Sequence, residues 1–324
     1  MRTNLFKFAA LGALAGVVIA ALCAFAMPER TTRTAIDLAL KLTRLDSRVQ
    51  EMPFGPVHYL IGGQGETVVF LHGIYSSKET WIRAGNSITL QNRSIIPDIP
   101  GFGENDALPD DGYRIEAQAV RLMQFLDAIG VKRFHVAGSS MGGMLATLIA
   151  RDHPARVLSL SLFGSPMGAA PAPNRAFQAA LGEGSSPLIV ENSDDVWERF
   201  DWIAEPTPLF FKWVARGLAE REIATPDLNH RIWNELFDGS ALLLADIAKD
   251  VPHPTFIVWC DEDRIYDVSG AAYLASQFQR GHHYILNGCG HSPVLSHHQP
   301  MIFLYQHVLD QVRATTFPFQ LPQL

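Results

Sequence analysis

The stretch RFHVAGSSMGGMLATLIARDH, residues 133–153, decides the fold, because an apolar run, a Gly/Ser corner and a helix-forming stretch follow one another in it without a linker. Residues 134–137 are typical of a buried strand end, and residues 141–153 are typical of a helix that Pro154 stops. The corner GSSMG matches the pattern G-x-S-x-G, in which a serine occupies a sharp strand-to-helix turn with an exposed hydroxyl. Its central residue, Ser140, is therefore the predicted nucleophile.

The glycines of this corner have a steric role. A β-carbon at Gly138 or Gly142 would collide with backbone in so sharp a turn, and Ser140 must hold a φ/ψ pair that only rigid surroundings enforce. The alternative is a purely structural turn, which predicts no acid and no histidine downstream in the order that a serine nucleophile needs. Both occur downstream, which favours the catalytic interpretation.

Apolar runs alternate with helix-like stretches on both sides of this turn. Strands buried on both faces are expected at residues 68–71, 94–98, 157–163, 255–260 and 283–286, and helices at residues 79–90 and 115–129. This alternation predicts an α/β fold with a mostly parallel sheet flanked by helices. We expect the core to comprise residues 53–164 and 251–315.

A long insertion, residues 165–250, interrupts the alternation. It has helical stretches at residues 194–203 and 208–223 and is rich in large apolar side chains: Trp197, Phe200, Trp202, Leu209, Phe210, Phe211, Trp213, Trp233 and Phe237. Many of these side chains must pack on the main domain. Because the insertion leaves the strand that follows the helix after Ser140, it is also placed to roof the serine and exclude water, so we predict a helical cap.

Composition limits the classes of function. With 324 residues, 48% of them hydrophobic, the chain can bury a large core, and its formal charge of −7 argues against a nucleic-acid partner. Zinc-type Cys/His spacings and phosphate-cradling loops are absent from the sequence, so no metal or nucleotide cofactor is expected. The cysteines, Cys23, Cys260 and Cys289, make no disulfide framework. Cys260 and Cys289 follow strands that could be neighbours, but bonding geometry is too specific to infer from sequence, so free thiols are the default expectation.

The N-terminus carries an uncharged apolar run at residues 8–27, which is long enough to cross a bilayer as a helix. We therefore predict that residues 1–28 are a membrane anchor. The alternative is a cleaved signal peptide, since residues 24–26 resemble an A-x-A cleavage site, and the protein would then be secreted or periplasmic. The retained anchor is favoured because the run exceeds the usual apolar length of a signal peptide.

Residues 29–52 are predicted to form an amphipathic linker helix. Apolar residues recur at spacings of three and four, and basic residues share a neighbouring face: Ala35, Leu38, Leu42, Leu45 and Val49, with Arg30, Lys41, Arg44 and Arg48. Two interpretations stay open. The helix lies on an anionic membrane surface, or its apolar stripe packs on the domain.

A serine nucleophile needs a general base and a third group that orients the base. His291 lies in a glycine-rich loop directly after a strand, and Asp263 lies on the loop that leaves the preceding strand. The order Ser140, Asp263, His291 is that of a triad built on a strand-turn-helix serine. Neighbouring acids compete with Asp263, namely Asp261, Glu262 and Asp267. The other histidines are expected to be structural or exposed, and His72 is expected to shape its turn through hydrogen bonds.

Negative charge that develops on a substrate carbonyl oxygen needs hydrogen-bond donors. Backbone N–H groups supply them without reorganising. Met141 follows the nucleophile at the start of a helix, and Ile74 follows His72-Gly73 after the strand at residues 67–71. The backbones of Ile74 and Met141 are therefore the predicted oxyanion hole.

Several of these strings together resemble the α/β-hydrolase superfamily, and within it the membrane-anchored monoacylglycerol lipase-type hydrolases. The resemblance covers residues 57–312 and rests on LHG at 71–73 with Trp81, DIPGFG at 98–103, GSSMGG at 138–143, VWCDED at 258–263 with DVSGA at 267–271, and NGCGHS at 287–292. It implies Ser140 as nucleophile, Asp263 as acid, His291 as base, and Ile74 and Met141 as oxyanion donors. Two features depart from the pattern. Cys260 stands where the superfamily usually has glycine, and the cap matches only faintly.

The leading hypothesis is a serine hydrolase that cleaves carboxylic esters of lipids, such as monoacylglycerols, through an acyl-enzyme intermediate, with a lipid ester and the membrane as its partners. On the same triad, a general carboxylesterase or a carbon-carbon bond hydrolase is the alternative. From another class, the chain could be a ligand-binding protein that keeps the fold without catalysis.

Overall fold

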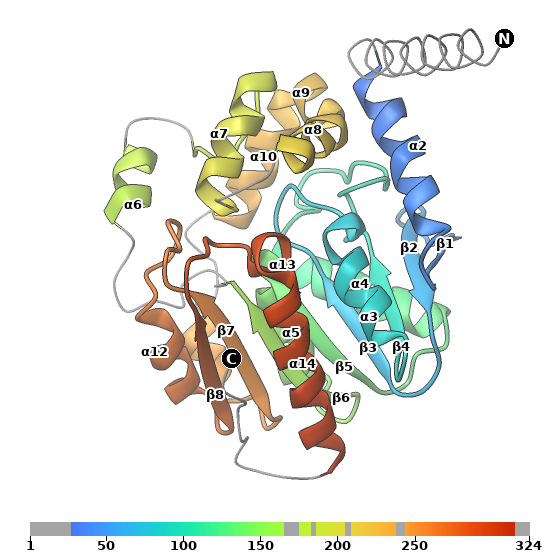
Figure 1. The fold of residues 1–324 in the computed structure, drawn as a ribbon, viewed down its shortest axis with the longest axis vertical. Helices are drawn as coiled ribbons and strands as arrows, with labels where there is room; N and C mark the ends of the chain where they lie inside the picture. Colours follow the sequence, from blue (N-terminus) through green and yellow to red (C-terminus); the bar gives the residue numbers. More distant parts are fainter. Residues whose placement is uncertain (1–26, 165–174, 183–185, 205–208, 238–243, 315–324) are drawn as a thin grey trace, which may run out of the picture.

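The computed structural model describes residues 27–164, 175–182, 186–204, 209–237 and 244–314. One sheet of eight strands runs through the molecule in the order β1-β2-β4-β3-β5-β6-β7-β8 (Figure 1). Its strands are β1 (Asp46–Gln50), β2 (Val57–Gly62), β3 (Thr67–Leu71), β4 (Arg93–Pro97), β5 (Phe134–Ser139), β6 (Val157–Phe163), β7 (Thr255–Cys260) and β8 (Gly281–Leu286). Neighbouring strands from β4 to β8 are parallel, and β2 is antiparallel to both β1 and β4, so the expected mostly parallel sheet is confirmed.

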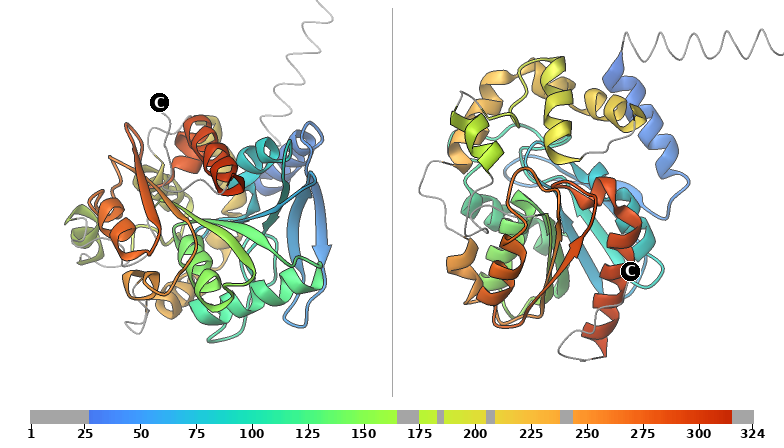
Figure 2. Two further views of the ribbon diagram at one scale, coloured as in Figure 1. Left: turned by 90° about the horizontal axis from the view of Figure 1, so that it is seen from below. Right: turned by 60° about the vertical axis from the view of Figure 1, so that its left-hand side comes forward.

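Helices cover both faces of this sheet (Figure 2). One face packs against α4 (Ile115–Ala128), α5 (Met141–Asp152), α11 (Leu244–Ala248) and α12 (Gly270–Gln277), and the other against η1 (Lys78–Trp81), α3 (Ile82–Ile88), α13 (Pro293–Ser296) and α14 (His298–Arg313). The buried strand β3 shows why the apolar runs are continuous. Val69 and Leu71 join one core cluster, and Val68 and Phe70 join the other, so each face of the strand needs apolar side chains.

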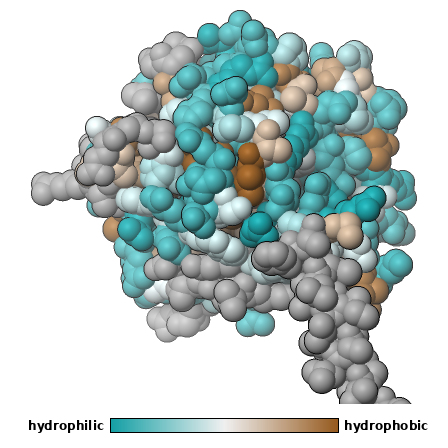
Figure 3. Space-filling model, turned by 90° about the horizontal axis from the view of Figure 1, so that it is seen from above, coloured by the Kyte–Doolittle hydropathy of each residue, from teal (hydrophilic) through white to brown (hydrophobic). Residues whose placement is uncertain are grey.

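The described part of the insertion is helical and lies over the carboxyl ends of the central strands (Figure 1). It contains α6 (Arg175–Gly182), α7 (Ser193–Ile203), α8 (Leu209–Leu218), α9 (Glu220–Ala224) and α10 (Pro226–Leu236). A capping box starts α7, because Asn192 accepts from the Asp194 N–H and Asp195 accepts from the Asn192 N–H. Seen from the cap side, hydrophobic side chains are scattered in small groups over a mostly hydrophilic surface (Figure 3).

The linker predicted as one helix over residues 29–52 divides into a helix and a strand. Helix α2 (Pro28–Leu40) ends before a turn, and Asp46–Gln50 then form β1, an edge strand paired with β2. The helical spacing therefore misled at residues 46–50, because the free edge of β2 offers backbone hydrogen-bond partners that outweigh a local preference for helix. The core sheet accordingly begins before residue 53.

Helix α2 packs on the cap rather than standing alone. Its contact with α8 is close because Gly217 has no side chain: a β-carbon there would lie 2.0 Å from Thr32 Oγ1. Arg33 on α2 also pairs with Glu104 of the core, with Nη1 and Oε1 2.9 Å apart. The apolar residues Leu38 and Leu42 stay exposed, so only part of the predicted apolar stripe packs on the domain.

The predicted membrane segment, residues 8–27, lies almost wholly outside the described residues. Among the helices of the described ranges, none has the length and apolar character needed to span a membrane.

Candidate active site

Ser140 occupies the strained turn that the sequence predicts. Its backbone has φ 52° and ψ −121°, between the end of β5 and the first residue of α5. Both glycine predictions hold geometrically: a β-carbon at Gly138 would lie 2.2 Å from the Gly142 carbonyl oxygen, and one at Gly142 would lie 2.3 Å from the Leu71 carbonyl oxygen. Because both positions are glycine, the start of α5 can approach the backbone of β3 and β5 closely. This tight turn places Ser140 outside the regular strand.

His291 and Asp263 form a buried hydrogen-bonded pair. His291 Nδ1 lies 2.9 Å from Asp263 Oδ2, and the two residues are 5% and 6% exposed. The other carboxylate oxygen, Oδ1, accepts from the backbone N–H groups of Ile265 at 2.8 Å and Tyr266 at 3.0 Å. Because these donors fix the carboxylate, it can hold the imidazole in one orientation and leave Nε2 as the nitrogen that exchanges protons.

The competing acids have other partners. Asp261 accepts from the Gly288 N–H at 2.8 Å, and Asp267 accepts from the Ser269 N–H at 2.9 Å. Both contacts stabilise turns rather than approach His291. Asp263 is therefore the carboxylate that the fold brings to the histidine.

The serine turn and the histidine loop meet at the carboxyl edge of the sheet. The Ser140 N–H donates to the Phe163 carbonyl at 3.3 Å, and a β-carbon on the next residue, Gly164, would lie 2.3 Å from the His291 carbonyl oxygen. On the other side, the Tyr266 ring is 5.7 Å from the imidazole and lines the same pocket as Ser140. Burial raises the pKa of Tyr266, with a further increase from Asp263, so the phenol stays protonated beside the pair.

A disulfide joins the two loops that carry this pair. Cys260 and Cys289 are bonded, with Cα atoms 5.2 Å apart, so the expectation of free thiols is wrong. The residues meet because β7 and β8 are parallel neighbours, with Cys260 opposite Leu286. Cys260 stands three residues before Asp263 and Cys289 two before His291, which explains why cysteine replaces the usual glycine of the superfamily at position 260.

The Ile74 N–H is oriented by His72. His72 is buried, and its Nε2 accepts from the Ile99 N–H at 2.9 Å, so its proton lies on Nδ1 and is donated to the Gly73 carbonyl at 2.8 Å. The Ile74 N–H belongs to the same peptide as that carbonyl and points the opposite way, because the peptide is planar and trans. Burial lowers the pKa of His72 to about 4, which keeps the ring neutral and the hydrogen-bond pattern fixed. The structural role predicted for His72 is therefore to orient the Gly73–Ile74 peptide.

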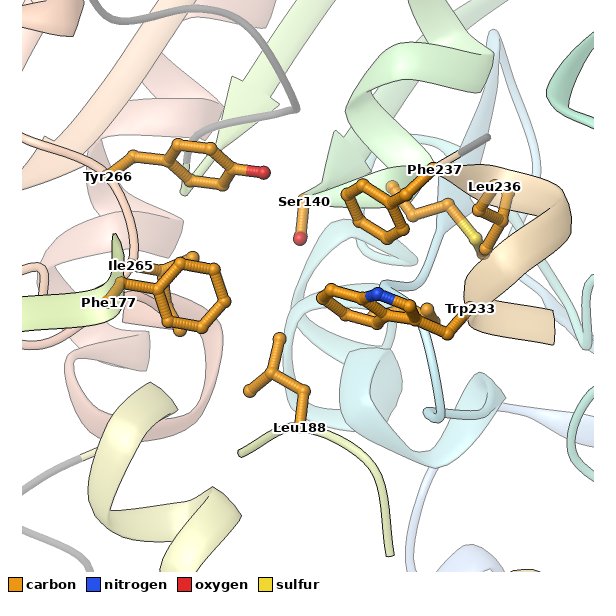
Figure 4. A pocket seen from close by; sticks show the side chains of 10 residues that line it. Ser140, Phe177, Leu188, Trp233, Leu236, Phe237, Ile265 and Tyr266 are labelled. Carbon is orange, nitrogen blue, oxygen red and sulfur yellow. The ribbon is translucent and has the colours of Figure 1, made fainter. Parts of the chain in front are cut away.

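An apolar pocket surrounds the serine hydroxyl (Figure 4). Its walls are Ile74, Met141, Phe177, Leu188, Trp233, Leu236, Phe237, Ile265 and Tyr266, which come from the core and from the cap. The rings of Trp233 and Phe237 stack 4.1 Å apart on one side, and Phe177 and Ile265 lie on the other. The sequence pointed to Trp233 and Phe237 only as cap aromatics and missed Phe177, Leu188 and Tyr266. Of these three, only Tyr266 could have been found from the sequence, because it lies three residues after the predicted acid Asp263.

Within the described ranges, no group of three or more His, Cys, Asp or Glu side chains is arranged to hold a metal ion. The chemistry available at the pocket is that of a serine, a histidine-carboxylate pair and backbone N–H donors.

Comparisons with known proteins agree with this geometry. The family model for the alpha/beta hydrolase fold matches residues 66–298. Monoacylglycerol lipase abhd6-B of Xenopus laevis is 28% identical over 266 residues, 78% of each chain, and Lipase 1 of Psychrobacter immobilis is 27% identical over 232 residues, 71% of this chain and 73% of that protein.

Among solved structures, a bacterial membrane phospholipase A superposes with a TM-score of 0.83 at 29% identity, covering 95% of this chain and 99% of that one. A family match over more than half of the chain, together with lipase and esterase relatives, settles the class. The chain belongs to the α/β-hydrolase fold family and is a carboxylic ester hydrolase of the lipase and esterase type.

Proposed function

We propose that the chain hydrolyses esters of lipids with a single acyl chain, such as monoacylglycerols, through an acyl-enzyme intermediate on Ser140. The observation that carries the proposal is the apolar pocket that opens around the Ser140 hydroxyl, since a fatty acyl chain matches walls of Trp, Phe, Leu and Ile. The monoacylglycerol lipases among the relatives support the same substrate class.

The chemistry follows from the three side chains. Ser140 Oγ attacks the ester carbonyl carbon while its proton passes to His291 Nε2, and the carbonyl oxygen takes the negative charge near the N–H groups of Ile74 and Met141. Collapse of this intermediate breaks the bond to the alcohol oxygen, which leaves with the proton from His291. A water molecule then attacks the acyl carbon, gives a proton to His291, and releases the fatty acid and the free Ser140 hydroxyl. Asp263 orients and stabilises the imidazolium in both halves.

The test is labelling with a fluorophosphonate, combined with a panel of monoacylglycerols, phospholipids and short aryl esters. Wild type should be labelled at Ser140 and should prefer single-chain lipid esters, and Ser140→Ala should lose labelling and reduce turnover by about 10⁴-fold or more. Ser159→Ala is the matched control, because Ser159 is buried in β6 away from the pocket. A folded wild type that takes no label would refute the enzyme mechanism, and equal rates on all esters would refute the lipid preference.

We also propose that the N-terminal segment holds the domain at a membrane. Residues 8–27 form an apolar run, and in the segment that follows it the exposed Leu38 and Leu42 lie beside the exposed Lys41 and Arg44 in the sequence, an amphipathic pattern. The membrane phospholipase A among the similar structures supports this placement. The disulfide favours an oxidising compartment for the domain. Removal of residues 1–27, which spares β1, should release the protein from the membrane fraction, and retention there would contradict the anchor.

A further inference from the structure

Tyr75, the residue after the oxyanion donor Ile74, has a strained backbone. Its φ is +52°, and in the described ranges only two other non-glycine residues, Asp111 and Ser140, have positive φ. Asp tolerates this region and Ser140 is held in the nucleophile turn, whereas a bulky tyrosine pays roughly 1–2 kcal/mol to occupy it. Contacts around Tyr75 must therefore hold it there.

Several of those contacts come from the cap. The Tyr75 hydroxyl donates to the Asn229 carbonyl of α10 at 2.6 Å, and the Arg199 guanidinium of α7 lies over the ring, 5.5 Å from its centroid. The ring also packs against the small cluster formed by Phe177, Leu188 and Ile265, which line the pocket. Tyr75 is a core residue whose polar and aromatic partners belong to the insertion.

These cap partners are themselves fixed. Arg199 Nη1 lies 2.7 Å from Glu222 Oε2 of α9, and the Arg199 side chain is only 7% exposed. The Asn229 side-chain amide donates to the carbonyls of Val190 at 2.6 Å and Glu222 at 2.9 Å. Tyr75 is therefore attached to the cross-braced part of the cap, where α7, α9 and α10 meet.

The donor Ile74 thus lies between two attachments. The peptide before it is held to the core by His72, and the residue after it is held to the cap by Tyr75. If Tyr75 relaxed to negative φ, the Ile74–Tyr75 peptide would rotate and shift the backbone of the donor. Helix α10 contributes both Asn229 and the pocket side chain Trp233, so the position of the acyl-pocket wall and that of Tyr75 are linked through one helix.

We propose that Tyr75 is a positioning residue that couples the seating of the cap to the alignment of the Ile74 N–H at the oxyanion hole. With the cap seated on Tyr75, the donor points at the carbonyl oxygen of a bound ester. With the cap displaced, the Ile74 N–H no longer points at that oxygen. This inference rests on the proposed ester hydrolysis at Ser140 and adds a reason why turnover requires a closed cap.

Tyr75→Phe tests it, because the ring and the backbone strain stay while the hydrogen bond to Asn229 is removed. We expect kcat on a soluble aryl ester to fall about tenfold, a fraction of the 10²- to 10³-fold cost of losing a whole oxyanion donor, with KM changed less than about twofold. Inhibition by a trifluoromethyl ketone, which forms a tetrahedral oxyanion on the serine, should weaken by the same factor as kcat. A purely structural role would not link these two quantities.

Tyr305→Phe is the matched control. Tyr305 is a buried tyrosine of α14 that packs against Phe70 and Phe163, and its hydroxyl has no hydrogen-bond partner among the described residues. It should leave kcat and inhibition unchanged. Tyr75→Gly is the second variant, because glycine accepts positive φ without strain yet loses the cap contact, and, with folding checked by circular dichroism, it should lower kcat at least as much.

The outcomes separate the two hypotheses. An active wild type with Tyr75→Phe and Tyr75→Gly at full kcat and full inhibitor affinity overturns the coupling. A folded wild type without activity or labelling overturns the proposed function instead.

Discussion

Strand β5 has a serine, a histidine and an acid grouped near each of its ends, and the two groups differ in the backbone of the serine and in how the acid is held. At the carboxyl end, Ser140 leaves the strand on a turn with positive φ and lines a pocket, and the Asp263–His291 pair reaches this pocket through Tyr266, which lines it and whose ring is 5.7 Å from the imidazole. At the amino end, His135 Nδ1 lies 2.8 Å from Ser159 Oγ, and His135 Nε2 lies 3.4 Å from Glu66 Oε2.

The second group lacks two features of the first that the proposed reaction requires. Ser159 is 1% exposed and lies inside β6, at the point where its pairing with β5 shifts register, so its hydroxyl faces protein rather than a cavity. Glu66 is exposed and also meets Arg313 at 3.3 Å, whereas Asp263 is buried and fixed by two backbone N–H groups. Proximity of the three residue types is therefore not sufficient. A catalytic group also needs an accessible nucleophile on a strained turn and an acid that is held in place.

Substitution of the acid should give the largest difference in kcat between the two groups. Asp263→Asn leaves the size of the side chain but removes the negative charge that holds His291, so kcat for ester hydrolysis should fall roughly 10³- to 10⁴-fold. Glu66→Gln makes the same chemical change at the other end and should alter kcat by less than about twofold. Steady-state kinetics with circular dichroism as a folding check measures both. Equal losses in the two variants would mean that both groups serve the reaction.

A second difference is covalent. The acid and base loops of the first group are joined by the Cys260–Cys289 disulfide, whereas the second group is built on adjacent strands. The sequence separation of 29 residues predicts that Cys260→Ala/Cys289→Ala lowers the free energy of unfolding by roughly 3–4 kcal/mol, since the bond restricts the unfolded chain.

Hydrogen exchange can locate this loss. In the double variant, exchange should accelerate around residues 261–266 and 287–292, while the amides near His135 and Ser159 follow only the global change in stability. Cys23→Ala is the control, because it removes a thiol and leaves the disulfide. Unchanged stability in the double variant, or local acceleration at the His135 end, would contradict this assignment of the disulfide to the Asp263–His291 loops.

Most of the fold and of the candidate site could be predicted from local sequence patterns. Ser140 directly follows β5, and Asp263 and His291 lie on the loops that follow β7 and β8. The carboxyl ends of parallel strands meet at one edge, so strand prediction brings these residues to the same edge. The glycines around Ser140 could be interpreted sterically without a structure. The central strands were also within reach, because strands buried on both faces give continuous apolar runs.

The features that sequence reasoning missed depend on distances between segments far apart in the chain. The disulfide requires the register of β7 against β8, and β1 requires a free edge on β2, neither of which is encoded locally. Tyr75 has no sequence signature, since its role comes from a backbone angle and from a carbonyl 154 residues away. The His135–Ser159 contact likewise depends on the pairing of β5 with β6.

The smallest predicted effect concerns pH and the second group. Burial lowers the pKa of His135 from 6.5 to about 4, only partly offset by Glu66, so the unfolded chain takes up a proton at a higher pH than the folded one. Stability is therefore complete above pH 6.5 and falls as the pH drops toward about 4, by at most about 3 kcal/mol from this residue. His135→Gln should flatten the pH dependence of urea unfolding between these limits, and part of it should persist because His72 has a similarly low pKa. The rate of ester hydrolysis at pH 8 should not change. If His135→Gln instead lowers kcat at that pH while the protein stays folded, the amino-end group is linked to the active site after all, and the contrast between the two ends of β5 fails.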